Sequence, residues 1–189
     1  MGTLTHALKE WQVTVNALTQ GETILLLRKG GIQERGGQFT VQHDRVWLYP
    51  TVEHQQPELL KPRYAVMVKS VAPEPETPPA AIALNAWAEV TAVMPVRDQV
   101  AAYHLLPWHV WNQEFVTARW QWKPERPLLA LVLRVHRLAV PLQIPYQAKY
   151  GGCRSWLELG TAIATEPSVP VLEEAQFAEQ LAAIRAIVD

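Results

Sequence analysis

The chain has 189 residues, of which 49% are hydrophobic and 19% are charged, and its formal net charge is -1 at pH 7. The length is typical of one compact domain, and the composition excludes a chain that is disordered throughout. The near-neutral charge provides no overall attraction to nucleic acid or to anionic lipid, so any anion-binding surface must be local.

The sequence also indicates in which cellular compartment the protein works and whether it binds a cofactor. One cysteine, Cys153, excludes an internal disulfide and fits a reducing compartment. No stretch approaches about 18 consecutive apolar residues, and MGTLTHALKEW at the start lacks the apolar centre of a secretory signal. Histidines are scattered and no CxxC occurs, so we expect no metal site and no other cofactor. These features predict a cytoplasmic protein without a membrane span.

The first elements are predicted from apolar spacing. Apolar residues recur at intervals of three and four from residue 4 to residue 18 and predict one amphipathic helix, which Gly21 would end. The apolar run 24–27 predicts a buried strand that carries Arg28 and Lys29 at its end.

A β-hairpin is predicted next, over GQFTVQHDRVWLYP (37–50). Glycine pairs at 30–31 and 36–37 predict the turns that precede it. Alternation along the second arm puts four side chains on one face: His43, Arg45, Trp47 and Tyr49. Pro50 is expected to end the strand, with His54 on the loop that follows.

The second half begins after VAPEPETPPA (71–80), whose prolines predict a surface excursion rather than a core element. The sequence then predicts a strand in 85–96, a short helix in 97–106, a tryptophan-rich helix over 108–122, a strand over 128–138, loop and turn over 141–159, and a helix over 177–188. Strands and helices do not alternate regularly. We therefore predict one α+β domain over residues 1–189, with a mixed or mainly antiparallel sheet flanked by helices.

Basic and proton-transferring side chains concentrate around the predicted strand ends and glycine turns. Arginine forks and lysines suit phosphate or carboxylate oxygens, histidine transfers protons near neutral pH, and tyrosine can position a ligand or donate a proton. The candidate anion-binding residues are Arg28, Lys29, Arg45 and Arg154, and the candidate catalytic residues are His43, His54 and Tyr49. This set predicts a nucleic-acid or nucleotide (phosphate) binding module, with metal-independent phosphodiester hydrolysis as an extension.

Three other interpretations remain open. In the first, the polar face belongs to an ordinary solvated strand edge, since such faces are common. The helix from Trp108 to Trp122 predicts instead a non-catalytic assembly or regulatory protein that binds a protein partner through its aromatic residues. A small-barrel fold that reads modified bases is the third, by analogy of fold only. Cys153, beside Arg154 after a glycine corner, is interpreted as a packed thiol unless a base lies next to it.

Four phrases carry a resemblance: ALKEW (7–11), LLRKGGI (26–32), LYPTVEHQ (48–55) and YGGCRSWLEL (150–159). Together they resemble an uncharacterised bacterial family, a domain of unknown function numbered eighteen hundred and two. The resemblance implies one domain running through nearly the whole chain and implies no activity. It also implies that several candidate site residues belong to the recurring phrases of that family, among them Arg28, Lys29, Tyr49, His54, Cys153 and Arg154.

Overall fold

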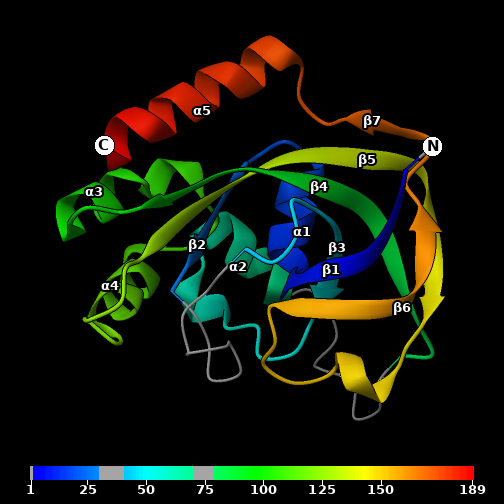
Figure 1. Cartoon of the computed structure of the whole chain (residues 1–189). Coiled ribbons are helices and arrows are strands. Elements are labelled where there is room, and N and C mark those ends of the chain that lie inside the picture. Colours follow the sequence, from blue (N-terminus) through cyan, green and yellow to red (C-terminus); the bar gives the residue numbers. More distant parts are fainter. Residues whose placement is uncertain (1, 30–40, 70–78) are drawn as a thin grey trace.

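The computed structural model describes residues 2–29, 41–69 and 79–189. In chain order the elements are β1 (Thr3–Trp11), α1 (Gln12–Thr19), β2 (Leu25–Arg28), β3 (Arg45–Thr51), the 3₁₀ turn η2 (Pro57–Leu59), α2 (Pro62–Lys69), β4 (Ala81–Pro95), α3 (Gln99–His104), η3 (Leu106–Trp108), α4 (Gln113–Gln121), β5 (Leu129–Pro145), η4 (Ala148–Tyr150), β6 (Trp156–Ala164), β7 (Ser168–Pro170) and α5 (Glu174–Val188) (Figure 1).

The described strands form one seven-stranded sheet in the order β2-β5-β4-β3-β1-β6, with β7 paired to β5. β1 and β3 run parallel, and the remaining pairs are antiparallel. The predicted α+β class, a mixed and mainly antiparallel sheet flanked by helices in a single domain, is therefore confirmed.

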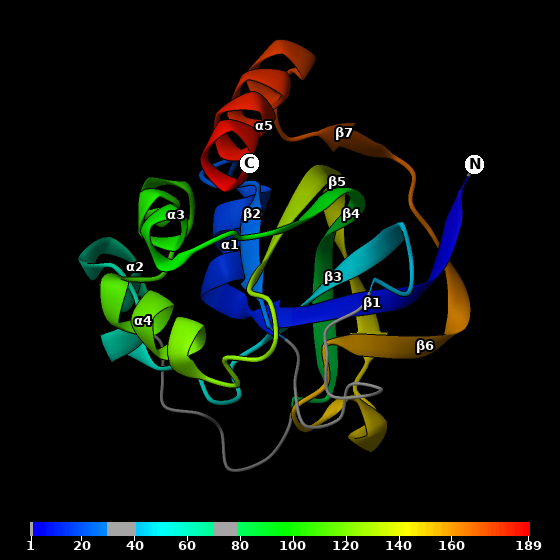
Figure 2. The ribbon, with the colours of Figure 1, turned by 60° about the vertical axis from the view of Figure 1, so that its left-hand side comes forward.

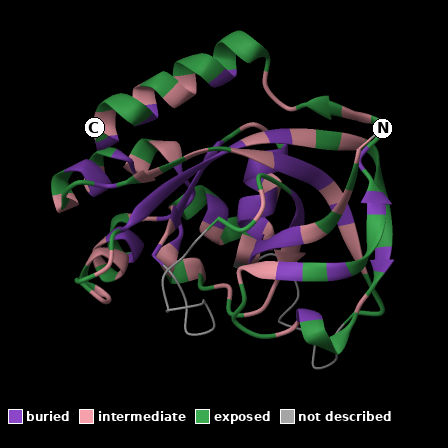
Figure 3. Cartoon of the chain, viewed as in Figure 1, coloured by how far each residue is buried: buried purple, intermediate pink, exposed green. Residues whose placement is uncertain are grey.

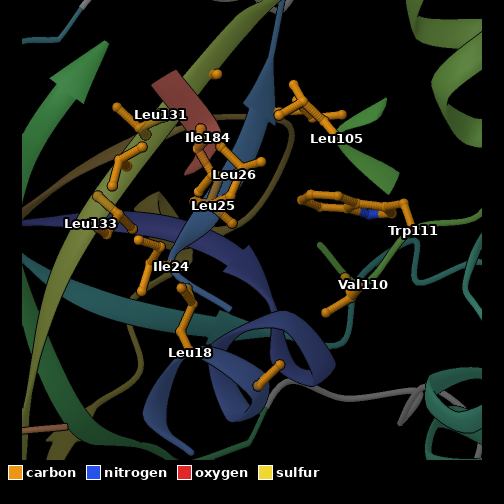
Figure 4. Packing of buried hydrophobic residues seen from close by; sticks show 14 of the residues in the cluster. Leu18, Ile24, Leu25, Leu26, Leu105, Val110, Trp111, Leu131, Leu133 and Ile184 are labelled. Carbon is orange, nitrogen blue, oxygen red and sulfur yellow. The ribbon is translucent and has the colours of Figure 1, made fainter. Parts of the chain in front are cut away.

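The sheet separates two hydrophobic clusters. The larger one lies between the sheet and the helices, where α2, α3 and α4 gather on one side of the molecule (Figure 2). Buried positions concentrate along β2 and the first half of β5 (Figure 3). Figure 4 shows side chains of β2 between Leu131 and Leu133 of β5 and Leu105 and Trp111 of the helical side. The smaller cluster lies on the other face and includes Trp47.

Strand β3 is buried on both of its faces. Val46 and Leu48 point into the larger cluster, whereas Trp47 and Tyr49 point into the smaller one. The predicted alternation is thus correct, but the face that carries Tyr49 is buried rather than open to solvent. Pro50 does not end the strand, because β3 continues to Thr51.

The predicted helix over 4–18 is wrong in its first half. Residues Thr3–Trp11 form a strand that pairs with β3 on one side and β6 on the other, and the helix begins only at Gln12. Pairing with two partners distant in sequence outweighed a local spacing that suits a helix.

The predicted hairpin over 37–50 is also wrong. Its second arm, β3, pairs with β1 and β4, and residues 37–40 of its first arm lie outside the described residues. The glycine pairs at 30–31 and 36–37 also lie outside the described residues. So does the proline-rich stretch 71–80, except for its last two residues.

Two boundaries in the second half differ from expectation. The tryptophan-rich helix begins at Gln113, because the side chain of Asn112 caps it by accepting a hydrogen bond from Phe115 N at 3.0 Å. The segment 141–159, predicted as loop and turn, contains the end of β5 and the start of β6. The strands predicted in 24–27, 85–96 and 128–138 and the C-terminal helix are confirmed as β2, β4, β5 and α5.

Candidate functional site

A cavity of about 520 Å³ lies where the ends of β1, β2 and β3 meet α4 and the loop 151–155. Because β1 and β3 are parallel, their last residues reach the same edge of the sheet, with Trp11 beside Thr51. Arg28 and Lys29 arrive from the end of β2. We call this the basic cavity; its lining comprises Lys9, Glu10, Trp11, Arg28, Lys29, Thr51, Glu53, His54, Gln56, Leu59, Trp111, Phe115, Ala118, Arg119, Trp122, Gly152, Cys153, Arg154 and Ser155.

Arg28 is held at the cavity by a carboxylate from β1, a strand that does not pair with β2. Its Nη2 atom lies 2.7 Å from Oε2 of Glu10 and donates a hydrogen bond to the carbonyl oxygen of Lys9 at 3.3 Å. Glu10 is itself buried, and its Oε1 accepts a hydrogen bond from Trp11 N at 2.7 Å. The guanidinium is therefore oriented before any ligand arrives.

Lys9 joins two loops that line the cavity. Its buried ammonium donates to Oε2 of Glu53 at 2.6 Å and to the carbonyl oxygens of Tyr150 at 2.9 Å and Gly152 at 3.0 Å. All three donors of the ammonium are therefore used inside the protein. This arrangement holds the loop that contains His54 against the loop that contains Arg154.

Arg119 of α4 is a cavity residue that the sequence-based prediction did not include. Its guanidinium lies 5.1 Å from the ring centroid of Phe115 and 5.7 Å from that of Trp122. Burial and then the positive charge of Arg28 lower the pKa of Arg119, while the negative charge of Glu10 opposes the shift. Among the described residues the Arg119 side chain has no hydrogen bond and no ion pair.

Helical spacing is the signal that would have identified Arg119. Positions 115, 118, 119 and 122 lie on one face of an α-helix, and the residues at all four line the cavity. The sequence-based interpretation of the helix over 108–122 considered its aromatic residues and left out the basic one.

Lys29 lies against α4. Its Nζ donates to the carbonyl oxygen of Trp120 at 2.6 Å and lies 5.6 Å from the Trp120 ring centroid. Burial lowers the pKa of Lys29, and the negative charge of Glu125 opposes the shift. Lys29 thus connects β2 to α4 while adding positive charge to the cavity wall.

The charges of the described cavity lining do not balance. Five basic side chains, those of Lys9, Arg28, Lys29, Arg119 and Arg154, face only two carboxylates. Both carboxylates are in ion pairs, Glu10 with Arg28 and Glu53 with Lys9. The cavity is therefore positive although the chain as a whole has a formal charge of -1.

Aromatic rings form another wall of the cavity. Trp111 and Phe115 are stacked with their ring centroids 4.8 Å apart at an interplanar angle of 10°, and Trp11 and Trp122 are half-buried at the cavity. Positive side chains and flat apolar surfaces thus lie within one cavity.

Four of the seven predicted site residues line this cavity: Arg28, Lys29, His54 and Arg154. His54 has a positive φ of 57°, which places it in a tight turn, and Arg154 is exposed. Cys153 is exposed beside Arg154, not packed as its sequence context suggested.

The other three predicted site residues lie elsewhere. His43 stacks on His6 with ring centroids 3.7 Å apart, and Arg45 lies over the ring of Trp87 at 4.4 Å. Tyr49 is buried against Tyr150, with ring centroids 5.6 Å apart, and burial raises the pKa of its hydroxyl. These three side chains do not line the basic cavity.

The described residues contain neither a metal-ligand cluster nor a membrane-spanning helix. Within residues 2–29, 41–69 and 79–189, no group of three or more histidine, cysteine, aspartate or glutamate side chains could hold a metal ion. In the same part of the chain, no helix combines the length and the apolar character needed to cross a membrane.

The chain is similar to a family of proteins and to several solved structures. The family model described as Domain of unknown function (DUF1802) matches residues 7–183. No curated protein matches the chain. Among solved structures, ASCH from Zymomonas mobilis is similar at 11% identity and a TM-score of 0.46, with 94% of this chain and 93% of that chain covered. A point mutant of the same protein gives 10% identity and a TM-score of 0.47, with 95% of this chain and 94% of that chain covered.

Proposed function

The chain belongs to the DUF1802 family, and we propose that its basic cavity binds phosphate groups of a nucleotide or of a single nucleic-acid strand. The observation that carries this proposal is Arg119, a half-buried guanidinium at the cavity with no hydrogen bond or ion pair among the described residues. Arg28 lies close enough to Arg119 to lower its pKa, and the nearby Glu10 carboxylate is paired with Arg28 rather than with Arg119. An anion bound there would supply the missing negative charge.

The aromatic wall supports a nucleotide over a simple inorganic anion. Bases stack on tryptophan and phenylalanine whatever their sequence, because every base has a π-face. Arg119 lies over the rings of Phe115 and Trp122, and Lys123 also lies over Trp122. The half-buried ring of Trp11 lines the same cavity, so the base of a nucleotide whose phosphate is at Arg119 would stack there. A volume of about 520 Å³ lies within the range of small-ligand sites.

The geometry favours binding over hydrolysis. Metal-independent cleavage of a phosphodiester needs an acid and a base on opposite sides of the phosphorus. Of the three residues predicted to transfer protons, only His54 lines the cavity, while His43 and Tyr49 lie elsewhere. We therefore propose a binding site and do not extend the proposal to a reaction.

The tryptophans of 108–122 give no support to a partner-facing aromatic surface. Trp111 is buried, and Trp108 and Trp120 pack against the larger hydrophobic cluster. Trp122 lines the basic cavity instead.

The proposal is tested by titrating a fluorescent single-stranded oligonucleotide at two salt concentrations. We expect binding that weakens as salt rises, because neutralising phosphates releases counterions. Arg119→Ala is expected to weaken binding about tenfold or more, since a hydrogen bond to a charged group contributes about 1.5–3 kcal/mol. The slope of log affinity against log salt should become shallower by about 0.7 for each phosphate that the variant no longer neutralises.

The matched control is Arg185→Ala, which removes the same charge from an exposed position on α5. We expect it to change affinity less than twofold. No binding at low salt, or equal losses of affinity in the two variants, would contradict the proposal.

A further inference from the structure

A second cavity, of about 380 Å³, lies beside the basic cavity and shares Lys9, Thr51 and Glu53 with it. Its walls come from α1, from the end of β3, from the start of β4, and from Tyr146 just after β5. We call it the amide cavity, after the side chains described next. The Lys9–Glu53 ion pair forms part of the wall that both cavities share.

Five neutral side chains with hydrogen-bonding groups line the amide cavity: Gln12, Asn16, Tyr49, Asn85 and Tyr146. Among the described residues none of these five side chains makes a hydrogen bond, and Oδ1 of Asn85 is buried without a partner. Buried polar groups are normally satisfied by protein, water or a ligand. Five polar side chains around one cavity, without hydrogen-bond partners in the described part of the chain, therefore indicate a binding surface.

The charge of this cavity differs from that of its neighbour. In its described lining the only charged side chains are Lys9 and Glu53, and they neutralise each other at 2.6 Å. Apolar side chains, including Val15, Pro50 and Ile82, form much of the remaining cavity lining. An uncharged ligand with both donors and acceptors suits such a surface better than an anion.

Amide side chains select a particular kind of neutral ligand. Each amide presents a donor and an acceptor side by side, which matches the donor and acceptor edge of a nucleobase. Tyrosine adds an aromatic surface with one hydroxyl.

We propose that the amide cavity binds an unpaired nucleobase of the ligand whose phosphate lies in the basic cavity. This inference rests on the proposed function and adds to it a second subsite for an uncharged ring. Because the two cavities share Lys9, Thr51 and Glu53, the proposed ligand would cross this common wall, with a phosphate in the basic cavity and a base in the amide cavity. The protein then prefers a dinucleotide or a longer single strand to a mononucleotide.

The experiment separates the two subsites by using probes that fill only one of them. Pyrophosphate tests the basic cavity, adenosine, cytidine and guanosine test the amide cavity, and a dinucleotide with one internal phosphate tests both. Binding is followed by chemical-shift titration of the full-length chain, with the unliganded spectrum of each variant as the check of folding.

Two variants address the amide cavity. Asn85→Ala and the milder Tyr146→Phe are each expected to weaken binding of the preferred nucleoside at least fivefold and to leave pyrophosphate affinity within twofold. Arg119→Ala is expected to weaken pyrophosphate binding at least fivefold and to leave the affinity for the nucleoside within twofold. The dinucleotide should bind more weakly to all three variants. Gln143→Ala removes an amide from an exposed position of β5 outside both cavities and should change nothing.

The outcomes distinguish this inference from the proposed function. If nucleosides do not bind, or bind equally to wild type, Asn85→Ala and Tyr146→Phe, the amide cavity is not a base site. Ribose binding as tightly as a nucleoside would also overturn the assignment. If pyrophosphate does not bind, or binds equally well without Arg119, it is the proposed function of the basic cavity that fails.

Discussion

Lys9 shows how one side chain can organise a site through bonds to the protein alone. Its ammonium is almost fully buried, with 5% of the side chain exposed, and it satisfies Glu53 and the carbonyl oxygens of Tyr150 and Gly152. Its backbone N–H also donates to the carbonyl oxygen of Ser155 at 2.8 Å. The position of Arg154 between these anchored residues therefore depends on a residue far away in sequence.

Lys9→Met is predicted to destabilise the fold by about 2–3 kcal/mol. Breaking a fully buried ion pair by removing one partner costs about 3–5 kcal/mol, and Glu53, with 29% of its side chain exposed, recovers some hydration. Urea unfolding measures the difference, with Lys149→Met as the control at an exposed lysine. A destabilisation below about 0.5 kcal/mol would show that the three hydrogen bonds of the Lys9 ammonium contribute little.

At the scale of elements, helix α4 determines the composition of the basic cavity. It places Arg119 and Phe115 on the same wall, and its N-terminus is tied to η2 by Asn112. The Asn112 side chain accepts a hydrogen bond from Phe115 N at 3.0 Å and donates one to the carbonyl oxygen of Glu58 at 2.6 Å. The orientation of Arg119 thus depends on a cap about two helical turns away.

Asn112→Ala is predicted to cost about 1–2 kcal/mol of stability and to weaken oligonucleotide binding. Removing an N-cap typically costs about 1 kcal/mol, and this substitution also deletes the hydrogen bond to Glu58. Asp98→Ala, which removes the cap of α3 by deleting the acceptor of Ala101 N, should cost a similar amount and leave binding unchanged. Thermal unfolding and the oligonucleotide titration measure both effects, and equal binding by the two variants would contradict the link between the α4 cap and the cavity.

At the scale of the whole molecule, His109 makes the stability of the fold depend on pH. The side chain is buried, and this burial, followed by the positive charge of Lys61, lowers its pKa from the ordinary value of 6.5 to about 3. Between pH 6.5 and about 3 the unfolded chain therefore binds a proton that the folded chain does not. Folding stability is lost as pH falls through this window.

His109→Leu is predicted to flatten this dependence. One group can contribute a slope of up to about 1.4 kcal/mol per pH unit inside the window, and the leucine has no proton to bind. Urea unfolding between about pH 4 and pH 7 spans most of the window and compares this variant with His104→Leu, which alters an exposed histidine. Identical slopes in the wild type and in His109→Leu would show that residue 109 does not carry the effect.

Much of the architecture could be predicted from the sequence because the responsible signals are local. The apolar run before Arg28 marks a buried strand whatever its partners, and the spacing from Phe177 to Val188 marks an amphipathic helix. The same locality explains the correct expectation that Arg28 and Lys29 emerge together at a strand end. Four of the seven candidate residues line one cavity, and their binding and catalytic roles stay predictions.

The remaining features were decided by interactions between distant parts of the chain. Residues 3–11 have helical spacing, but they form a strand because β3 and β6 offer hydrogen-bonding partners on both sides. His43 lies outside the cavity because β3 begins after it, at Arg45, and its ring stacks on His6. Arg119 lies in the cavity because α4 packs with that face toward the ends of β1 and β2. Local sequence determined which residues form strands and helices in most of the chain. Only the tertiary structure decided which charged side chains share a cavity, because strand pairing and helix packing join residues more than a hundred positions apart.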